Sequence, residues 1–215
     1  MTDSAETSIS MALRERITEA ASQWVELPLL VGVRDGSLDT AVFRHYLEQD
    51  YRYLHYYARI YSRLAAQAAT DDELEHFIAL ANGILSVELE HHKHAAAPFG
   101  CDFDRIEPSP QLRDYLAFYD AIADDRDATL VAMLPCIYGY GVALALIRDA
   151  TVDGPYRDWI DIYTGGDYAE IMDRHFAMVD GCSLSPDRAL AIVEQGLAHE
   201  IEFWNQRPEA PEVQS

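Results

Sequence analysis

The 215-residue sequence predicts an all-α fold, a single-domain helical bundle. Apolar residues recur at three- and four-residue spacing along most of the chain, and the alternation typical of strands is nearly absent. Prolines, glycines and capping residues separate these stretches at short intervals. In addition, residues 129–147 are apolar nearly all round, which is typical of a central buried helix.

The N-terminal part of the chain predicts two helices that flank a connection. Residues 11–24 are amphipathic and follow serines that can cap a helix. Residues 27–38 contain Pro28 and an Asp-Gly-Ser turn signal, so we expect a connection there. Residues 40–69 then place a stripe of tyrosine, phenylalanine and leucine side chains on one helical face.

The remaining helices are also bounded by caps and by prolines. Thr70 caps a long helix that runs to about residue 96, and Pro98 follows its end. Pro135 lies inside the central helix and removes a backbone hydrogen bond, so we expect a kink just before Cys136. The other predicted helices cover residues 111–123, 129–147, 156–163, 168–179 and 185–206.

Charge and cysteine content limit the class of function. The chain has 16 Lys plus Arg against 37 Asp plus Glu, a net charge of −21 that repels nucleic acids and anionic membranes, so neither is an expected partner. Three widely spaced cysteines and a polar N-terminus without a signal peptide favour a reduced, cytoplasmic protein. We expect flexible tails at about 1–10 and 207–215. The acidic, lysine-poor composition fits a halophile or a GC-rich genome, and both remain open.

Three helical stretches each place one reactive side chain on an otherwise apolar face: Asp50, Cys136 and Glu200. Carboxylates are almost never fully buried unless they are paired, and no basic residue shares the face of Asp50 or Glu200 at three or four positions. A structural cysteine and structural ion pairs are the alternative interpretation. The three groups together, with several tyrosines, favour a site for covalent chemistry on a small polar molecule.

A possible metal motif, Glu-x-x-His, occurs at Glu73 and His76 and again at Glu88 and His91. On one continuous helix the two pairs are roughly 22 Å apart, so they cannot share a dimetal centre. We therefore expect no metal, and we interpret residues 91–94 as a helix C-terminus at which histidines favour partial positive charge.

Four segments resemble the thiaminase II (TenA) family: residues 43–54 (FRHYLEQDYRYL), 135–140 (PCIYGY), 156–163 (YRDWIDIY) and 200–204 (EIEFW). The resemblance covers essentially the whole chain. It implies a haem-oxygenase-like helical bundle without haem or other cofactor, usually a homotetramer. It also implies hydrolysis of thiamin or of 4-amino-5-aminomethyl-2-methylpyrimidine to the hydroxymethylpyrimidine that re-enters thiamin synthesis.

The resemblance also assigns roles to residues. It implies that Cys136 is the nucleophile, that Glu200 is the acid/base and that Asp50 binds the amino edge of the pyrimidine. The substrate-binding residues are then Tyr53, Tyr140, Tyr163, Tyr115 and Phe203. The preferred substrate stays open, and a metal-dependent oxidase or a non-catalytic helical regulator are the alternative functions.

Overall fold

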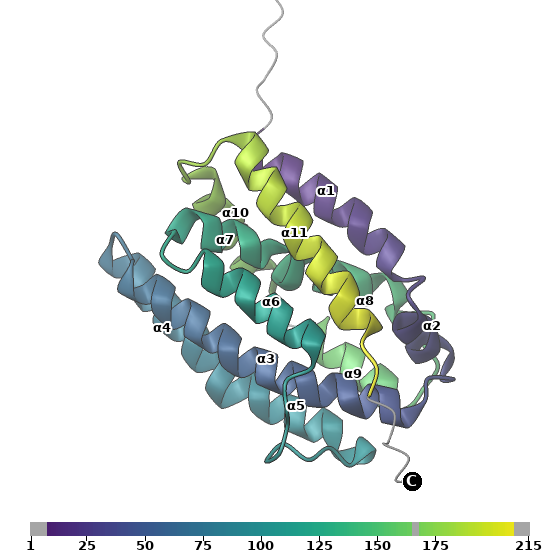
Figure 1. Ribbon diagram of the computed structural model, residues 1–215. Helices are drawn as coiled ribbons and strands as arrows, with labels where there is room; N and C mark the ends of the chain where they lie inside the picture. Colours follow the sequence, from purple (N-terminus) through teal and green to yellow (C-terminus); the bar gives the residue numbers. More distant parts are fainter. Residues whose placement is uncertain (1–7, 165–167, 209–215) are drawn as a thin grey trace, which may run out of the picture.

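The computed structural model describes residues 8–164 and 168–208, in which every regular element is a helix (Figure 1). This confirms the predicted all-α class. The α-helices are α1 Ile9–Trp24, α2 Pro28–Asp35, α3 Thr40–Ala66, α4 Asp71–Gly83, α5 Leu89–Ala96, α6 Pro110–Ala121, α7 Arg126–Leu134, α8 Tyr140–Arg148, α9 Pro155–Tyr163, α10 Tyr168–Asp180 and α11 Pro186–Asn205. Three short turns of other helix types are η1 Ile84–Glu88, η2 Ala97–Phe99 and η3 Pro135–Gly139.

Short polar side chains begin many of these helices. Each accepts a hydrogen bond from a backbone N–H of the first turn, which would otherwise have no partner. The capping residues are Ser8, Asp39, Thr70, Ser109, Asp125 and Ser185. These capping residues therefore determine locally where each of these helices begins.

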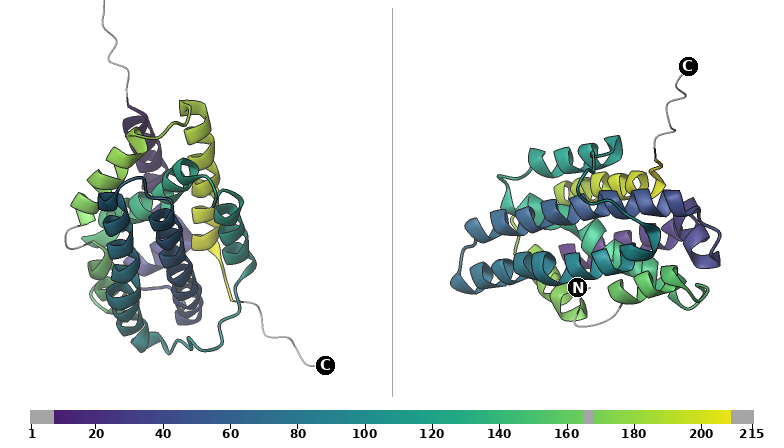
Figure 2. Two further views of the ribbon diagram at one scale, coloured as in Figure 1. Left: turned by 90° about the vertical axis from the view of Figure 1, so that its left-hand side faces the viewer. Right: turned by 90° about the horizontal axis from the view of Figure 1, so that it is seen from below.

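The long aromatic helix α3 lies between two groups of helices. Helices α6 and α11 lie on one side of it and the α4–α5 segment on the other, as Figures 1 and 2 show from different directions. Helix α1 packs beside α11. This arrangement surrounds the interior with side chains from α3, α4, α6 and α11.

The central helical stretch Arg126–Arg148 combines α7, η3 and α8. By length and composition it could cross a membrane, with a mean hydropathy of 2.1, but 61% of that window is buried inside the protein. Every residue from Ala128 to Leu134 is buried. The stretch is thus a core helix, as its all-round apolar pattern predicts.

The predicted connection at residues 27–38 is wrong, because residues Pro28–Asp35 form helix α2. Proline is compatible with the first turn of a helix, where its missing N–H has no partner to lose. The Asp-Gly-Ser signal ends this helix, and Gly36 adopts a left-handed conformation with φ of 76°. The predicted N-terminal tail, about residues 1–10, is also two residues too long, since α1 begins at Ile9. Residues 1–7 and 209–215 lie outside the described residues.

Two π-helical turns interrupt long helices. The interruption predicted at Pro135 takes the form of η3, and the long helix predicted from residue 71 to 96 is divided by η1. A π-turn inserts an extra residue into the helix and is frequent at functional sites. Here Glu88 ends one of these turns and Cys136 lies in the other.

Candidate active site

A cavity of about 620 Å³ lies among α3, the α4–η1 segment, α6, η3, α9 and α11. The structure brings together at its wall all eight residues predicted as site residues, which come from five separate parts of the chain. They are Asp50, Tyr53, Tyr115, Cys136, Tyr140, Tyr163, Glu200 and Phe203. Helical packing therefore assembles one chemical environment from residues that are far apart in sequence.

Glu200 is a buried carboxyl group at this wall, with only 4% of its surface exposed. Its Oε1 accepts a hydrogen bond of 2.6 Å from the Tyr115 hydroxyl. Burial raises the pKa of Glu200 to about 7, and the hydrogen bond from Tyr115 acts in the opposite direction. A carboxyl group with this pKa can both give and take a proton near neutral pH.

A chain of tyrosine hydroxyls leads to Glu200. Tyr119 donates to the Tyr115 hydroxyl at 3.3 Å, and the hydroxyls of Tyr53 and Tyr119 are 3.0 Å apart. Because the Tyr119 proton is used toward Tyr115, the bond from Tyr53 to Tyr119 has Tyr53 as donor. Burial raises the pKa of each of these tyrosines well above its ordinary value, so all three stay protonated donors.

Cys136 faces the cavity from η3, so part of its surface is open to that space although it lies deep in the bundle. Burial and then the charge of Glu200 raise the pKa of the thiol well above its ordinary value. The group therefore rests as a neutral thiol. It needs a nearby base before it can act as a nucleophile.

Asp50 lies opposite a buried histidine that the sequence analysis did not place in the site. Its Oδ2 is 3.5 Å from Nδ1 of His92, and the Tyr163 hydroxyl is 3.3 Å from the same nitrogen. The His92 Nε2 lies 2.8 Å from the Leu47 carbonyl, which can only accept, so the ring proton is assigned to Nε2 and Nδ1 presents a lone pair.

Burial lowers the pKa of His92 to about 4, so this imidazole is neutral. For His92, this corrects the interpretation of residues 91–94 as a helix C-terminus at which histidines favour partial positive charge. Burial, followed by the charges of Glu88 and Glu200, raises the pKa of Asp50 well above its ordinary value. Asp50 is therefore a much stronger base than an exposed aspartate.

Aromatic rings form much of the remaining wall. Two of these wall residues, Tyr46 and Tyr140, stack on the buried Trp204 ring behind the wall, each at a centroid distance of 5.2 Å. Tyr140 meets Tyr163 edge to face at 5.4 Å, and Phe203 contacts Tyr53 at 5.7 Å. Such ordered, flat surfaces favour a flat aromatic ligand.

The Glu-x-x-His residues take separate roles. Glu73 pairs with Arg126 at 2.6 Å, whereas His76, Glu88 and His91 line the cavity. No group of three or more potential metal ligands is arranged to hold an ion among the residues that the structure describes.

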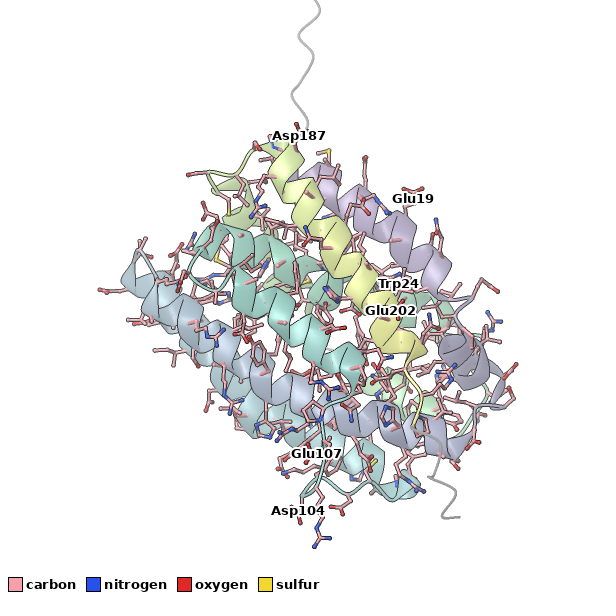
Figure 3. The ribbon with its side chains drawn as sticks, viewed as in Figure 1. Glu19, Trp24, Asp104, Glu107, Asp187 and Glu202 are labelled. Atoms are coloured by element: carbon pink, nitrogen blue, oxygen red, sulfur yellow. The ribbon has the colours of Figure 1, made fainter. Side chains whose placement is uncertain are left out.

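On α11, Glu202 is exposed on the outer side of the helix, as Figure 3 shows, whereas Glu200 is buried.

Sequence reasoning missed Glu88, His92 and Tyr119 as residues of this environment. The signal for the first two was their spacing of four residues, which places both on one helix face. The metal interpretation paired Glu88 with His91 instead, and His91 is exposed. Tyr119 follows Tyr115 by one helical turn, so it too could have been found by its spacing.

The fold and the cavity define an all-helical protein that holds a buried thiol among carboxyl groups and tyrosines. The chain belongs to the TENA/THI-4/PQQC family, whose sequence model matches residues 14–209. This confirms the resemblance on which the site residues were assigned.

Two curated relatives of this chain are named as enzymes that act on pyrimidines. It is 29% identical over 161 residues to an aminopyrimidine aminohydrolase of Halalkalibacterium halodurans, a match that covers 71% of this chain and 72% of the relative. It is 28% identical over 150 residues to a hydroxymethylpyrimidine/phosphomethylpyrimidine kinase of Saccharomyces cerevisiae. That match covers 66% of this chain but only 27% of the kinase. These relatives support an enzyme of this family.

Solved structures confirm the fold. A TenA homologue from P. horikoshii OT3 superposes with a TM-score of 0.82 at 25% identity, over 92% of this chain and 96% of that one. A domain with a haem-oxygenase-like fold from Shewanella denitrificans superposes with a TM-score of 0.71 at 16% identity, over 90% of this chain and 89% of that domain. The predicted haem-oxygenase-like bundle is thus the observed one.

Proposed function

We propose that this protein is an aminopyrimidine aminohydrolase, or thiaminase II, that acts in thiamin salvage. Its substrates are 4-amino-5-aminomethyl-2-methylpyrimidine and thiamin, and its product is 4-amino-5-hydroxymethyl-2-methylpyrimidine. The observation that carries the proposal is the convergence of Cys136, Glu200 and Asp50 on one cavity with aromatic walls. The Halalkalibacterium aminohydrolase supports the same reaction class.

Binding uses the flat walls and one carboxyl oxygen. The pyrimidine ring lies against tyrosine faces, among them Tyr140 and Tyr163, which exclude water from both sides of the ring. Asp50 uses a carboxyl oxygen to accept a hydrogen bond from the exocyclic amino group of the pyrimidine. These contacts fix the ring beside Cys136.

Glu200 and Cys136 then activate the ring. Protonated Glu200 gives its proton to a ring nitrogen, which makes the neighbouring ring carbon electrophilic. The thiol proton passes to Asp50 while the Cys136 sulfur forms a bond to that carbon. The ring loses its aromaticity and gains an electron pair that can be pushed toward the methylene group.

Departure of the substituent and addition of water complete the reaction. The bond between the methylene carbon and the amine nitrogen breaks, and the nitrogen leaves with the electron pair as ammonia, or as the thiazole in the case of thiamin. Water adds to the methylene carbon and gives a proton to the carboxylate of Glu200. The carbon–sulfur bond then breaks and Asp50 returns the proton to Cys136. The ring nitrogen gives its proton to the released amine or to water, and the neutral aromatic ring is restored. One water is consumed and one amine is released.

The direct test is to incubate the purified protein with each pyrimidine and to separate the products by chromatography. We expect hydroxymethylpyrimidine and an equal amount of ammonia from the aminomethylpyrimidine, or hydroxymethylpyrimidine and thiazole from thiamin. Parallel samples treated with a chelator should give the same rates, because protein groups perform every proposed step. If neither pyrimidine is converted, the proposed function is wrong.

A further inference from the structure

The cavity is acidic. The carboxyl groups of Asp50, Glu88 and Glu200 line it, whereas no arginine or lysine among the described residues does. Among the described residues, the basic side chains at this wall are the imidazoles of His76 and His91. Such a space disfavours anions and favours ligands with positive charge.

Glu88 is the one of these carboxyl groups that the proposed reaction does not use. It ends the π-turn η1 and lies one helical turn before His92, whose Nδ1 is 3.5 Å from Asp50. Its carboxyl group therefore borders the Asp50 side of the cavity. That position is beside the place proposed for the amino edge of the pyrimidine, which Asp50 binds.

Glu88 also has no partner among the residues that the structure describes. It forms no ion pair within 4.0 Å and no hydrogen bond with any of them. Burial alone raises its pKa to about 7. A carboxylate at a buried wall without a partner is costly, and a cationic ligand that reaches it removes that cost.

We propose that Glu88 selects substrates by the positive charge of the group they lose. This inference rests on the proposed function. The aminomethylpyrimidine carries an ammonium and thiamin carries a thiazolium on the methylene carbon, whereas the product carries a neutral hydroxyl there. Glu88 binds that cation, so the site favours either substrate over the product, and the reaction itself removes the charge that Glu88 holds.

The test compares two proteins, the Cys136→Ser variant and the double variant that also carries Glu88→Gln. Both lack the thiol, so the substrate is not consumed during the measurement. Calorimetry measures the affinity for the aminomethylpyrimidine and for the hydroxymethylpyrimidine. We expect Glu88→Gln to weaken aminomethylpyrimidine binding about tenfold or more, because it removes a buried partner of the ammonium. Binding of the neutral hydroxymethylpyrimidine should change by less than about twofold, which also shows that the variant is folded.

Glu75→Gln is the matched control. Glu75 is exposed on α4 and does not line the cavity, so its removal changes the net charge equally and should leave both affinities unchanged. Equal affinity of Glu88→Gln for the aminomethylpyrimidine, or an equal loss for both pyrimidines, would overturn the role of Glu88. If the Cys136→Ser protein binds neither pyrimidine, the proposed function fails and this inference fails with it.

Discussion

At the scale of single residues, the pKa of Glu200 decides whether the site has an acid at neutral pH. Burial raises this pKa to about 7, and the 2.6 Å hydrogen bond from Tyr115 lowers it from what burial alone would cause. A hydrogen bond donated to a carboxylate stabilises the charged form, so its loss moves the pKa upward. Tyr115 therefore sets the pH range in which Glu200 can donate a proton.

Tyr115→Phe should shift the pH dependence of kcat/KM. The reaction needs protonated Glu200, so wild-type activity should fall as pH rises through about 7. Without the hydroxyl, the pKa of Glu200 rises and the fall should move to higher pH. Steady-state rates across a pH series measure this shift.

Two further variants test whether the fall in kcat/KM with rising pH is caused by Glu200. Tyr56→Phe removes a hydroxyl that donates to Asp120 away from the cavity, and it should leave the profile unchanged. Glu200→Gln should be slow at every pH and should lack the fall near pH 7. A Tyr115→Phe profile identical to that of the wild type would contradict the proposed acid, because Glu88 has the same pKa and could be its source.

Periodicity was sufficient to single out three polar residues that line the cavity, but not their partners. Asp50, Cys136 and Glu200 stand out because each is a polar residue on an apolar helical stripe. Spacing places His92 on one helix face with Glu88, but its contact with Asp50 depends on how α5 packs against α3. The position of Glu88 depends in addition on a π-turn, which shifts the helix faces by one residue and has no simple sequence signal.

At the scale of helices, close approach between α11 and η3 positions Cys136. A Cβ atom at Gly196 would lie 2.9 Å from Cγ of Pro135, the first residue of η3. Glycine therefore allows α11, which carries Glu200, to pack against the turn that carries the thiol. The predicted helices were largely correct because caps and stripes are local, whereas this approach is a tertiary feature.

Gly196→Ala should destabilise the protein by about 1–3 kcal/mol, because the added methyl group forces α11 and η3 apart. Turnover should fall as well, since the thiol and Glu200 move relative to each other. Gly83→Ala is the matched substitution, because a Cβ there meets nothing within 4 Å. It should stabilise the protein by up to about 1 kcal/mol through helix propensity.

Urea unfolding of the two alanine variants measures the predicted decrease in the free energy of unfolding for Gly196→Ala and the predicted increase for Gly83→Ala. A Gly196→Ala protein as stable as the wild type would show that the contact with Pro135 relaxes without cost. In that case, the spacing of α11 and η3 would not depend on glycine.

At the scale of the whole molecule, the bundle serves to keep ionisable groups out of water. Its family and its fold agree with the sequence prediction because four motifs in order identify the family over nearly the full chain. The homotetramer and the cytoplasmic location stay predictions. The whole chain has a net charge of −21. The cavity is acidic as well, because three carboxyl groups line it and no arginine or lysine among the described residues does.

The measurement that tests the account most directly is turnover of the aminomethylpyrimidine by Cys136→Ser beside Cys101→Ser and Cys182→Ser. The other two cysteines are outside the cavity, so their variants should keep wild-type turnover. Cys136→Ser should keep its melting temperature but lose about a thousandfold or more in kcat, because an alcohol is a far weaker nucleophile than a thiol. A Cys136→Ser protein with near wild-type turnover would contradict the covalent mechanism and the central role of this cavity's thiol.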